Sequence, residues 1–304
     1  MEKFEINILG CGSALPTTRH NPSAQVINIR EKLYMIDCGE GTQLQLRRSK
    51  LKFSRLNTIF ISHLHGDHCF GLIGLISTFN LLGRTADLHI YAHPDLETIL
   101  RPQLDYFCNG MTYNVITHPI NPAVSEQIYE DRSMTVTTIP LRHRVPSCGF
   151  LIKEKPTPDH INRQQIDYYK IPTSQLNIIK NGAGYTTPDG QHIPHTKLTT
   201  PSDPPRSYAY MSDTSYLPER APLISGVTLL YHEATFAQTD HQRAVQTRHS
   251  TTVQAARTAL LADARQLIIG HYSARYLDEN ILLEEARKIF PNTILAQENT
   301  TIKI

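Results

Sequence analysis

Short apolar runs alternate with helix-like patterns along most of the chain. The apolar runs predict strands at residues 4–9, 24–29, 32–36, 58–61, 88–91, 134–139, 208–211, 227–231 and 266–269. Apolar positions spaced three and four residues apart predict helices at residues 69–82, 251–261 and 281–290, and Pro291 closes the last of them. Because strands and helices alternate throughout, we expect an α/β fold built in layers, not separate all-α and all-β parts.

Residues 153–206 interrupt this alternation. Prolines accumulate there beside Asn181-Gly182-Ala183-Gly184, and strand-like sequence resumes on both sides. A segment of this composition is not an ordinary core, so we interpret it as an inserted arm within a single domain that spans residues 1–304. The arm is only weakly basic, and its sequence fits a plain surface excursion as well as a binding arm.

The composition is that of a soluble globular protein. The chain has 304 residues, of which 40% are hydrophobic, enough to bury a full core. No apolar run reaches the roughly 18–20 residues that a membrane span needs, and no secretory signal is predicted. The five cysteines are scattered and form no CxxC pair, which indicates reduced thiols and a cytoplasmic location.

Charge alone does not identify a partner. The 30 basic and 28 acidic residues leave a formal net charge of +2, too small to diagnose nucleic-acid binding. One strongly basic cluster lies just upstream of the strand predicted at residues 58–61, and it consists of Arg47, Arg48, Lys50, Lys52 and Arg55. The cluster is either a solvated helix face with its turn or a contact to a phosphate backbone.

The strongest chemical signal is the HxHxDH motif formed by His63, His65, Asp67 and His68. An extended backbone that leaves the predicted strand points residues two apart to the same side, so His63 and His65 can reach one cation. Gly66 permits a turn, after which Asp67 and His68 begin an apolar helix and can reach a second cation. Imidazole and carboxylate ligands without cysteine favour zinc, with manganese or iron next. A His-rich surface loop is the alternative, but such loops rarely lie between a buried strand and a buried helix.

Three further candidate ligands lie at or just beyond the ends of predicted strands. They are His143, Asp213 and His271. Taken singly, each is more often a structural residue than a ligand, but together with the HxHxDH motif they complete a site for two metal ions. Asp213 is the natural bridge, because a carboxylate has two oxygens and can bind two cations at once.

Two later segments offer groups for proton transfer and anion binding. His249-Ser250-Thr251 opens a predicted helix, so its hydroxyls and backbone N–H groups can receive a phosphate. Ser250 can also be the simple N-cap of that helix, and the two roles are compatible. Glu233, in His232-Glu233-Ala234-Thr235, follows a predicted strand and offers a carboxylate that can orient a nearby imidazole.

These motifs resemble the metallo-β-lactamase superfamily. The segments at residues 232–235 and 249–251 are similar to those of the ribonuclease Z family of tRNA 3′-processing endonucleases, and the likeness extends to the loop at residues 9–17 and the turn at residues 37–42. The resemblance spans nearly the whole chain. It implies a four-layer αβ/βα sandwich with the metals at one edge, an arm at residues 153–206 that protrudes and grips the elbow of tRNA, and a homodimer.

The resemblance also implies a ligand set and a reaction. His63, His65 and His143 would hold one Zn²⁺, Asp67, His68 and His271 the other, and Asp213 would bridge the two zinc ions of each subunit. A hydroxide oriented by Asp67 would attack the phosphorus just after the discriminator nucleotide. His249, oriented by Glu233, would protonate the departing oxygen, leaving a tRNA 3′-OH and a 5′-phosphorylated trailer.

Two other functions fit the same residues. One is a different hydrolase on the same scaffold, acting on a sulfate ester, lactone, thioester or small phosphodiester. The other is a metal-stabilised RNA-binding protein without catalysis, which the complete ligand set and the proposed proton donor disfavour.

Overall fold

The computed structural model describes residues 2–304, which form two compact units. The larger unit, here called the body, consists of Glu2–Lys153 and Arg206–Ile304, and the smaller unit, the arm, consists of Glu154–Pro205. Each unit has a hydrophobic core of its own.

The body contains two large β-sheets of seven strands each. The first sheet has the order β18-β1-β2-β3-β4-β5-β6, with β1 (Phe4–Gly10), β2 (Ala24–Ile29), β3 (Lys32–Cys38), β4 (Leu56–Phe60), β5 (Leu88–Ala92), β6 (Val115–Pro119) and β18 (Thr301–Lys303). The second has the order β17-β16-β15-β14-β9-β8-β7, with β7 (Gln127–Glu130), β8 (Met134–Pro140), β9 (Cys148–Glu154), β14 (Ser207–Met211), β15 (Leu229–Glu233), β16 (Gln266–Gly270) and β17 (Thr293–Leu295).

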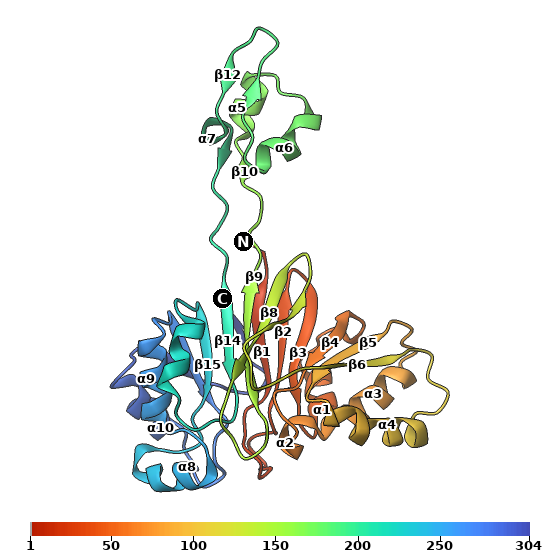
Figure 1. Cartoon of the computed structure of the whole chain (residues 1–304), viewed down its shortest axis with the longest axis vertical. Helices are drawn as coiled ribbons and strands as arrows, with labels where there is room; N and C mark the ends of the chain where they lie inside the picture. Colours follow the sequence, from red (N-terminus) through yellow and green to blue (C-terminus); the bar gives the residue numbers. More distant parts are fainter. Residues whose placement is uncertain (1) are drawn as a thin grey trace. The chain divides into compact units, whose positions relative to one another are not determined.

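Both faces of the first sheet are buried. Neighbouring strand residues point to opposite faces, so Phe60 joins the core between the two sheets while Ile59 joins the core beneath the helices. Helices α1 (Thr42–Arg48), α3 (Gly71–Leu81) and α4 (Asp95–Phe107) supply that outer core, and α9 (Thr252–Leu261) and α10 (Asn280–Arg287) lie beside the second sheet (Figure 1). The expected four-layer αβ/βα architecture is confirmed.

Parallel strand pairing brings the chemically important loops to one edge. Strands β3, β4, β5 and β6 are parallel to one another, as are β14, β15, β16 and β17. The carboxyl ends of parallel strands meet at the same edge of a sheet, which is where ligands bind in open α/β sheets. The loops that follow β14, β15 and β16 therefore lie at one edge of the second sheet, and Ser62, after β4, reaches them through a 2.9 Å hydrogen bond to Ser212, after β14.

The helix predicted at residues 69–82 is present as α3, and a short separate helix, α2, precedes it. Helix α2 covers Gly66–Cys69 and α3 begins at Gly71. A Cβ atom on Gly71 would lie 2.1 Å from the backbone oxygen of Gly39, so only glycine permits the chain to pass this close to the turn after β3. The helix start is thereby pressed against that turn.

Two further observations concern the described residues 2–304. No helix among them is long and apolar enough to cross a membrane. All five cysteines are free thiols, and four of them are buried.

The arm packs short elements around a small apolar cluster. It contains β10 (His160–Ile161), α5 (Arg163–Tyr168), α6 (Leu176–Lys180), β11 (Tyr185–Thr186), β12 (His192–Ile193), α7 (His195–Leu198) and β13 (Thr199–Thr200). Ile166, Ile179 and Leu198 are buried in its centre. Residues 154–205 hold equal numbers of basic and acidic side chains, so the arm has no net charge of its own.

Candidate dinuclear metal centre

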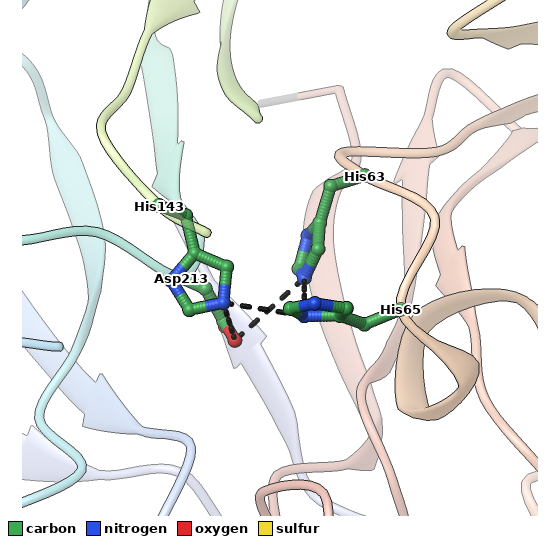
Figure 2. A group of neighbouring side chains, drawn as sticks. All are labelled: His63, His65, His143 and Asp213. Carbon is green, nitrogen blue, oxygen red and sulfur yellow. Dashed lines mark hydrogen bonds and ion pairs between the residues drawn. The ribbon is translucent and has the colours of Figure 1, made fainter. Parts of the chain in front are cut away.

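The HxHxDH motif occupies the loop between β4 and α2. The chain leaves β4 at Phe60 and reaches α2 at His65, whose backbone is extended, with a φ of −75° and a ψ of 151°. His63 and His65 therefore point toward the same space, as the sequence predicts (Figure 2). Asp67 and His68 follow within α2.

A first cluster of ligand atoms consists of His63, His65, His143 and one oxygen of Asp213. His65 Nδ1 lies 3.1 Å from His63 Nε2 and 3.2 Å from His143 Nε2. Asp213 Oδ2 lies 3.7 Å from His63 Nε2 and 3.6 Å from His143 Nε2 (Figure 2). His143 follows β8 and Asp213 follows β14, so distant segments complete the cluster.

A second cluster consists of Asp67, His68, His271 and the other oxygen of Asp213. Asp213 Oδ1 lies 3.3 Å from His68 Nε2 and 3.1 Å from His271 Nε2. Asp67 Oδ2 lies 3.4 Å from His68 Nε2 and 3.5 Å from His271 Nε2. Asp213 thus faces each cluster with a different oxygen, which is the arrangement that a bridging ligand requires.

The distances between the donor atoms in each cluster match those between the ligands of a bound metal ion. A tetrahedral zinc ion with bonds of about 2.0–2.1 Å holds its donor atoms about 3.3 Å apart, close to the spacings in both clusters. In the second cluster Asp67 Oδ2, His68 Nε2, Asp213 Oδ1 and His271 Nε2 are buried and have no hydrogen-bond partner within residues 2–304. Buried polar atoms without partners are costly, and a cation would satisfy all four at once.

The first cluster is also in the protonation state that a metal needs. Burial lowers the pKa of His63, His65 and His143, because an imidazolium is poorly solvated there. These imidazoles are therefore neutral and keep a lone pair for a cation.

A second layer of groups orients the ligands through their other ring nitrogens. His143 Nδ1 donates to the backbone oxygen of Arg248 over 2.9 Å, and His271 Nδ1 lies 2.8 Å from Thr235 Oγ1. His68 Nδ1 donates to Asp37 Oδ2 over 2.7 Å. Each contact leaves the nitrogen that faces the cluster free to bind a metal.

Asp37 is the functional residue that the sequence reasoning missed. It is fully buried at the end of β3, where Ser62 N, Ser62 Oγ and Tyr210 OH also donate to its carboxylate at 2.8–2.9 Å. Its φ of 57° is unusual for a residue other than glycine. The signal in the sequence was an aspartate directly after an apolar strand, the same signal that identified Asp213.

Glu233 and His249 form a separate pair beside the second cluster. His249 Nδ1 lies 3.0 Å from Glu233 Oε1. Burial opposes the charge of His249, but the Glu233 carboxylate outweighs it and raises the pKa of His249 to about 9. Because Nδ1 faces Glu233, Nε2 is the ring nitrogen left to donate a proton.

The donors of residues 250–251 are occupied within the protein. Ser250 N–H donates to Glu233 Oε1 and Ser250 Oγ donates to the backbone oxygen of Thr214. Thr251, not Ser250, is the N-cap of α9, in a capping box with Gln254. The interpretation of these groups as a phosphate receptor, and of Ser250 as the cap, is therefore wrong.

A cavity of about 710 Å³ opens over both clusters. His65, Asp67, His143, Asp213, His249 and His271 line it, and so do Phe70, Arg144, Arg243 and Arg275. Arg144 and Arg243 are exposed, and within the described chain neither side chain has a hydrogen bond or an ion pair. The cavity wall thus carries two cations without a protein partner among residues 2–304, which suits a polyanionic substrate.

Arg55, the last cation of the basic cluster at residues 47–55, is not next to this centre. Arg55 directly precedes β4, whereas His63 follows it. Five extended residues span about 16 Å at 3.3 Å per residue, so the strand carries Arg55 to the opposite edge of the sheet. Arg55 therefore lies away from the metal centre, and its side chain pairs with Glu31.

Comparison with known proteins agrees with this architecture. A metallo-β-lactamase fold protein from Bacillus subtilis, YhfI, has a TM-score of 0.69 and 18% identity, with 100% of both chains covered. Human tRNase Z, short form, has a TM-score of 0.71 and 25% identity, with 98% of each chain covered. The sheets and the two clusters at their edge therefore define a metallo-β-lactamase fold protein.

The sequence relatives are closer. A ribonuclease Z from Bacteroides fragilis is 63% identical over 304 residues, with 100% of both chains covered. One from Phocaeicola vulgatus is 64% identical, covering 100% of this chain and 98% of its own. The chain therefore belongs to the ribonuclease Z family. Over residues 4–160 it also belongs to the family described as Anti-Pycsar protein Apyc1, a match that ends before Asp213, Glu233, His249 and His271.

Proposed function

We propose that this protein is a metal-dependent endoribonuclease that removes the 3′ trailer from tRNA precursors. The observation that carries the proposal is the combination of both ligand clusters with the Glu233–His249 pair in one cavity, in a chain that is 63% identical to a ribonuclease Z over its full length. We place the cut just after the discriminator nucleotide.

Two zinc ions fit the clusters, with manganese or iron as substitutes. His63, His65 and His143 would hold one ion and Asp67, His68 and His271 the other, with Asp213 offering one oxygen to each. When bound, the ions supply an activated water near neutral pH and neutralise charge on the phosphate. Asp67 would offer one carboxylate oxygen to its ion and the other to the attacking water.

His249 completes the reaction from the opposite side of the scissile bond. Its raised pKa keeps the imidazolium populated at neutral pH, so Nε2 can protonate the departing 3′ oxygen. Five hydrogen bonds keep Glu233 ionised, because each is donated to the carboxylate. The products are a tRNA with a 3′-OH and a trailer with a 5′-phosphate.

Recognition of the RNA rests on contacts to its shape and backbone. Arg144 and Arg243 at the cavity rim are free to hold phosphates beside the scissile one. The arm supplies a remote contact to the tRNA elbow. Since the arm has no net charge, exposed side chains such as Tyr168, which is 75% exposed, contribute more to that contact than charge does.

We further propose that two chains form a homodimer through the outer helices. Leu44 on α1 and Leu81 on α3 are 56% and 83% exposed, and Leu82, just after α3, is 55% exposed. Exposed apolar side chains gathered on adjoining helices are typical of protein interfaces. A single Leu81→Asp substitution is therefore expected to convert a dimer into a monomer, measured by light scattering after size exclusion.

The proposed location is the cytoplasm. Five free thiols, without a disulfide among them, are typical of a reducing compartment. The proposed substrate, a tRNA precursor, is an intracellular RNA.

The decisive experiment is incubation of the zinc-loaded protein with an end-labelled tRNA precursor, followed by mapping of the cut and analysis of both new ends. We expect one cut after the discriminator, a 3′-OH and a 5′-phosphate. Folded Asp67→Ala protein is the control for a contaminating nuclease. Turnover of small esters without any cleavage of the precursor would instead identify another hydrolase, and binding without cleavage would identify an RNA-binding protein.

A further inference from the structure

Thr235 lies between the second metal cluster and the Glu233–His249 pair. Its side chain is buried, with 3% of the residue exposed. Thr235 Oγ1 lies 2.7 Å from Glu233 Oε2 and 2.8 Å from His271 Nδ1. Thr235 belongs to the motif at residues 232–235, but the sequence indicates no role for its hydroxyl.

The direction of each hydrogen bond follows from the groups involved. An ionised carboxylate only accepts, so Thr235 donates its single hydroxyl proton to Glu233. The hydroxyl oxygen then accepts from His271 Nδ1–H. This fixes the His271 tautomer with its lone pair on Nε2, the atom that lies 3.1 Å from Asp213 Oδ1 in the second cluster.

Glu233 therefore accepts hydrogen bonds at both of its carboxylate oxygens. Through Oε1 it accepts from His249 Nδ1 over 3.0 Å, and through Oε2 it accepts from Thr235. We infer that the Thr235 hydroxyl is a positioning group that transmits the charge of Glu233 to the metal ligand His271, so that one buried carboxylate orients both that ligand and the proton donor. This inference rests on the proposed function only for the role of His249.

The contact is of the kind that strengthens a metal site. A metal-bound imidazole is a better ligand when its other N–H donates to a carboxylate, and here the carboxylate is reached through one hydroxyl. Loss of such a partner typically weakens metal binding by about 10–100-fold. Because the hydroxyl is the only polar part of the side chain, valine and serine separate its chemistry from its shape.

The test measures zinc affinity, which needs no RNA substrate. Zinc is titrated against a chromophoric chelator for the wild type, Thr235→Val and Thr235→Ser. We expect Thr235→Val to weaken the binding of one of the two zinc ions by about 10–100-fold. The zinc affinity of Thr235→Ser is expected to stay near that of the wild type. Thr252→Val is the matched control, because it removes another buried hydroxyl that donates to a carboxylate, that of Glu285, away from both clusters.

A double substitution tests transmission itself. If Glu233 acts on His271 through Thr235, Glu233→Gln also weakens the binding of that zinc ion. The double variant Glu233→Gln/Thr235→Val then binds zinc about as tightly as Glu233→Gln alone. Additive losses, or unchanged zinc affinity in Thr235→Val, would overturn the inference. If Thr235→Val does not fold, by its circular dichroism, Thr235→Ala takes the same test with the same expectations. If the zinc affinities change as expected but the zinc-loaded wild type leaves the tRNA precursor uncleaved, the proposed function is rejected and this inference stands.

Discussion

His249 Nδ1 lies 3.0 Å from Glu233 Oε1, and this contact assigns His249 a role different from that of the other histidines in the cavity. Glu233, His249 and His271 offer ligand atoms close enough together to hold a metal. However, both oxygens of Glu233 already accept hydrogen bonds from backbone and side-chain donors. The pair is therefore equipped for proton transfer and not for a third cation.

Replacement of His249 tests that assignment. His249→Ala removes the proton donor but none of the proposed ligands, so kcat on a tRNA precursor is expected to fall by roughly a hundredfold to ten-thousandfold. The zinc content, measured by atomic absorption, is expected to stay at two ions per chain. Loss of zinc would mean that His249 is a ligand and not an acid.

The charge of Glu233 predicts a shift in the pH dependence. An acid must be protonated to act, so kcat falls as the pH rises through the pKa of His249, which Glu233 raises to about 9 in the absence of metals. Bound cations lower that value in the wild type and in the variant alike. Glu233→Gln removes the opposing charge, so the alkaline fall in kcat is expected to begin at least about one pH unit lower. Profiles of kcat against pH at saturating precursor check this for the wild type and Glu233→Gln. An alkaline fall at the same pH in both proteins would contradict it.

Asp67 combines two roles that the substitution to alanine removes together. It is a ligand in the second cluster, where its Oδ2 lies 3.5 Å from His271 Nε2, and it lines the cavity where the attacking water must sit. Asp67→Ala is expected to lower cleavage by about a thousandfold or more while the protein still folds. Turnover near that of the wild type in the folded variant would reject the proposed site.

The ligands were predictable because each one follows an apolar strand. His143, Asp213 and His271 come directly after β8, β14 and β16, and parallel strands bring β14 and β16 to the same edge. Local pattern and sheet topology therefore lead to the same residues. The family resemblance added which ligands share an ion.

Other features depend on contacts that the sequence does not display. The backbone oxygen of Arg248 that accepts from His143 carries no side-chain signal, and Asp37 reaches Tyr210 across the core between the sheets. Helix α4 escaped prediction because Pro102 interrupts its pattern. Proximity in sequence to His63 does not bring Arg55 to the metal centre, because the length of β4 separates the two residues.

The arm offers a test that separates recognition from chemistry. Its apolar cluster, which includes Ile166, Ile179 and Leu198, belongs to the arm alone, so the body keeps its own core when the arm is removed. We replace residues 157–200 with a short Gly/Ser linker between the two connecting segments. Contacts remote from the scissile phosphate supply binding and positioning, so KM for a tRNA precursor is expected to rise strongly.

The matched substrate is a small aryl phosphodiester, which uses the same metals but has no tRNA elbow for the arm to bind. Its turnover is expected to stay near that of the wild type, because all ligands, Glu233 and His249 lie in the body. Equal losses on both substrates would mean that the arm supports the fold of the body. An unchanged KM for the precursor would mean that the arm, which has no net charge, is only a surface excursion. Recognition of the RNA would then rest on the cavity wall around Arg144 and Arg243.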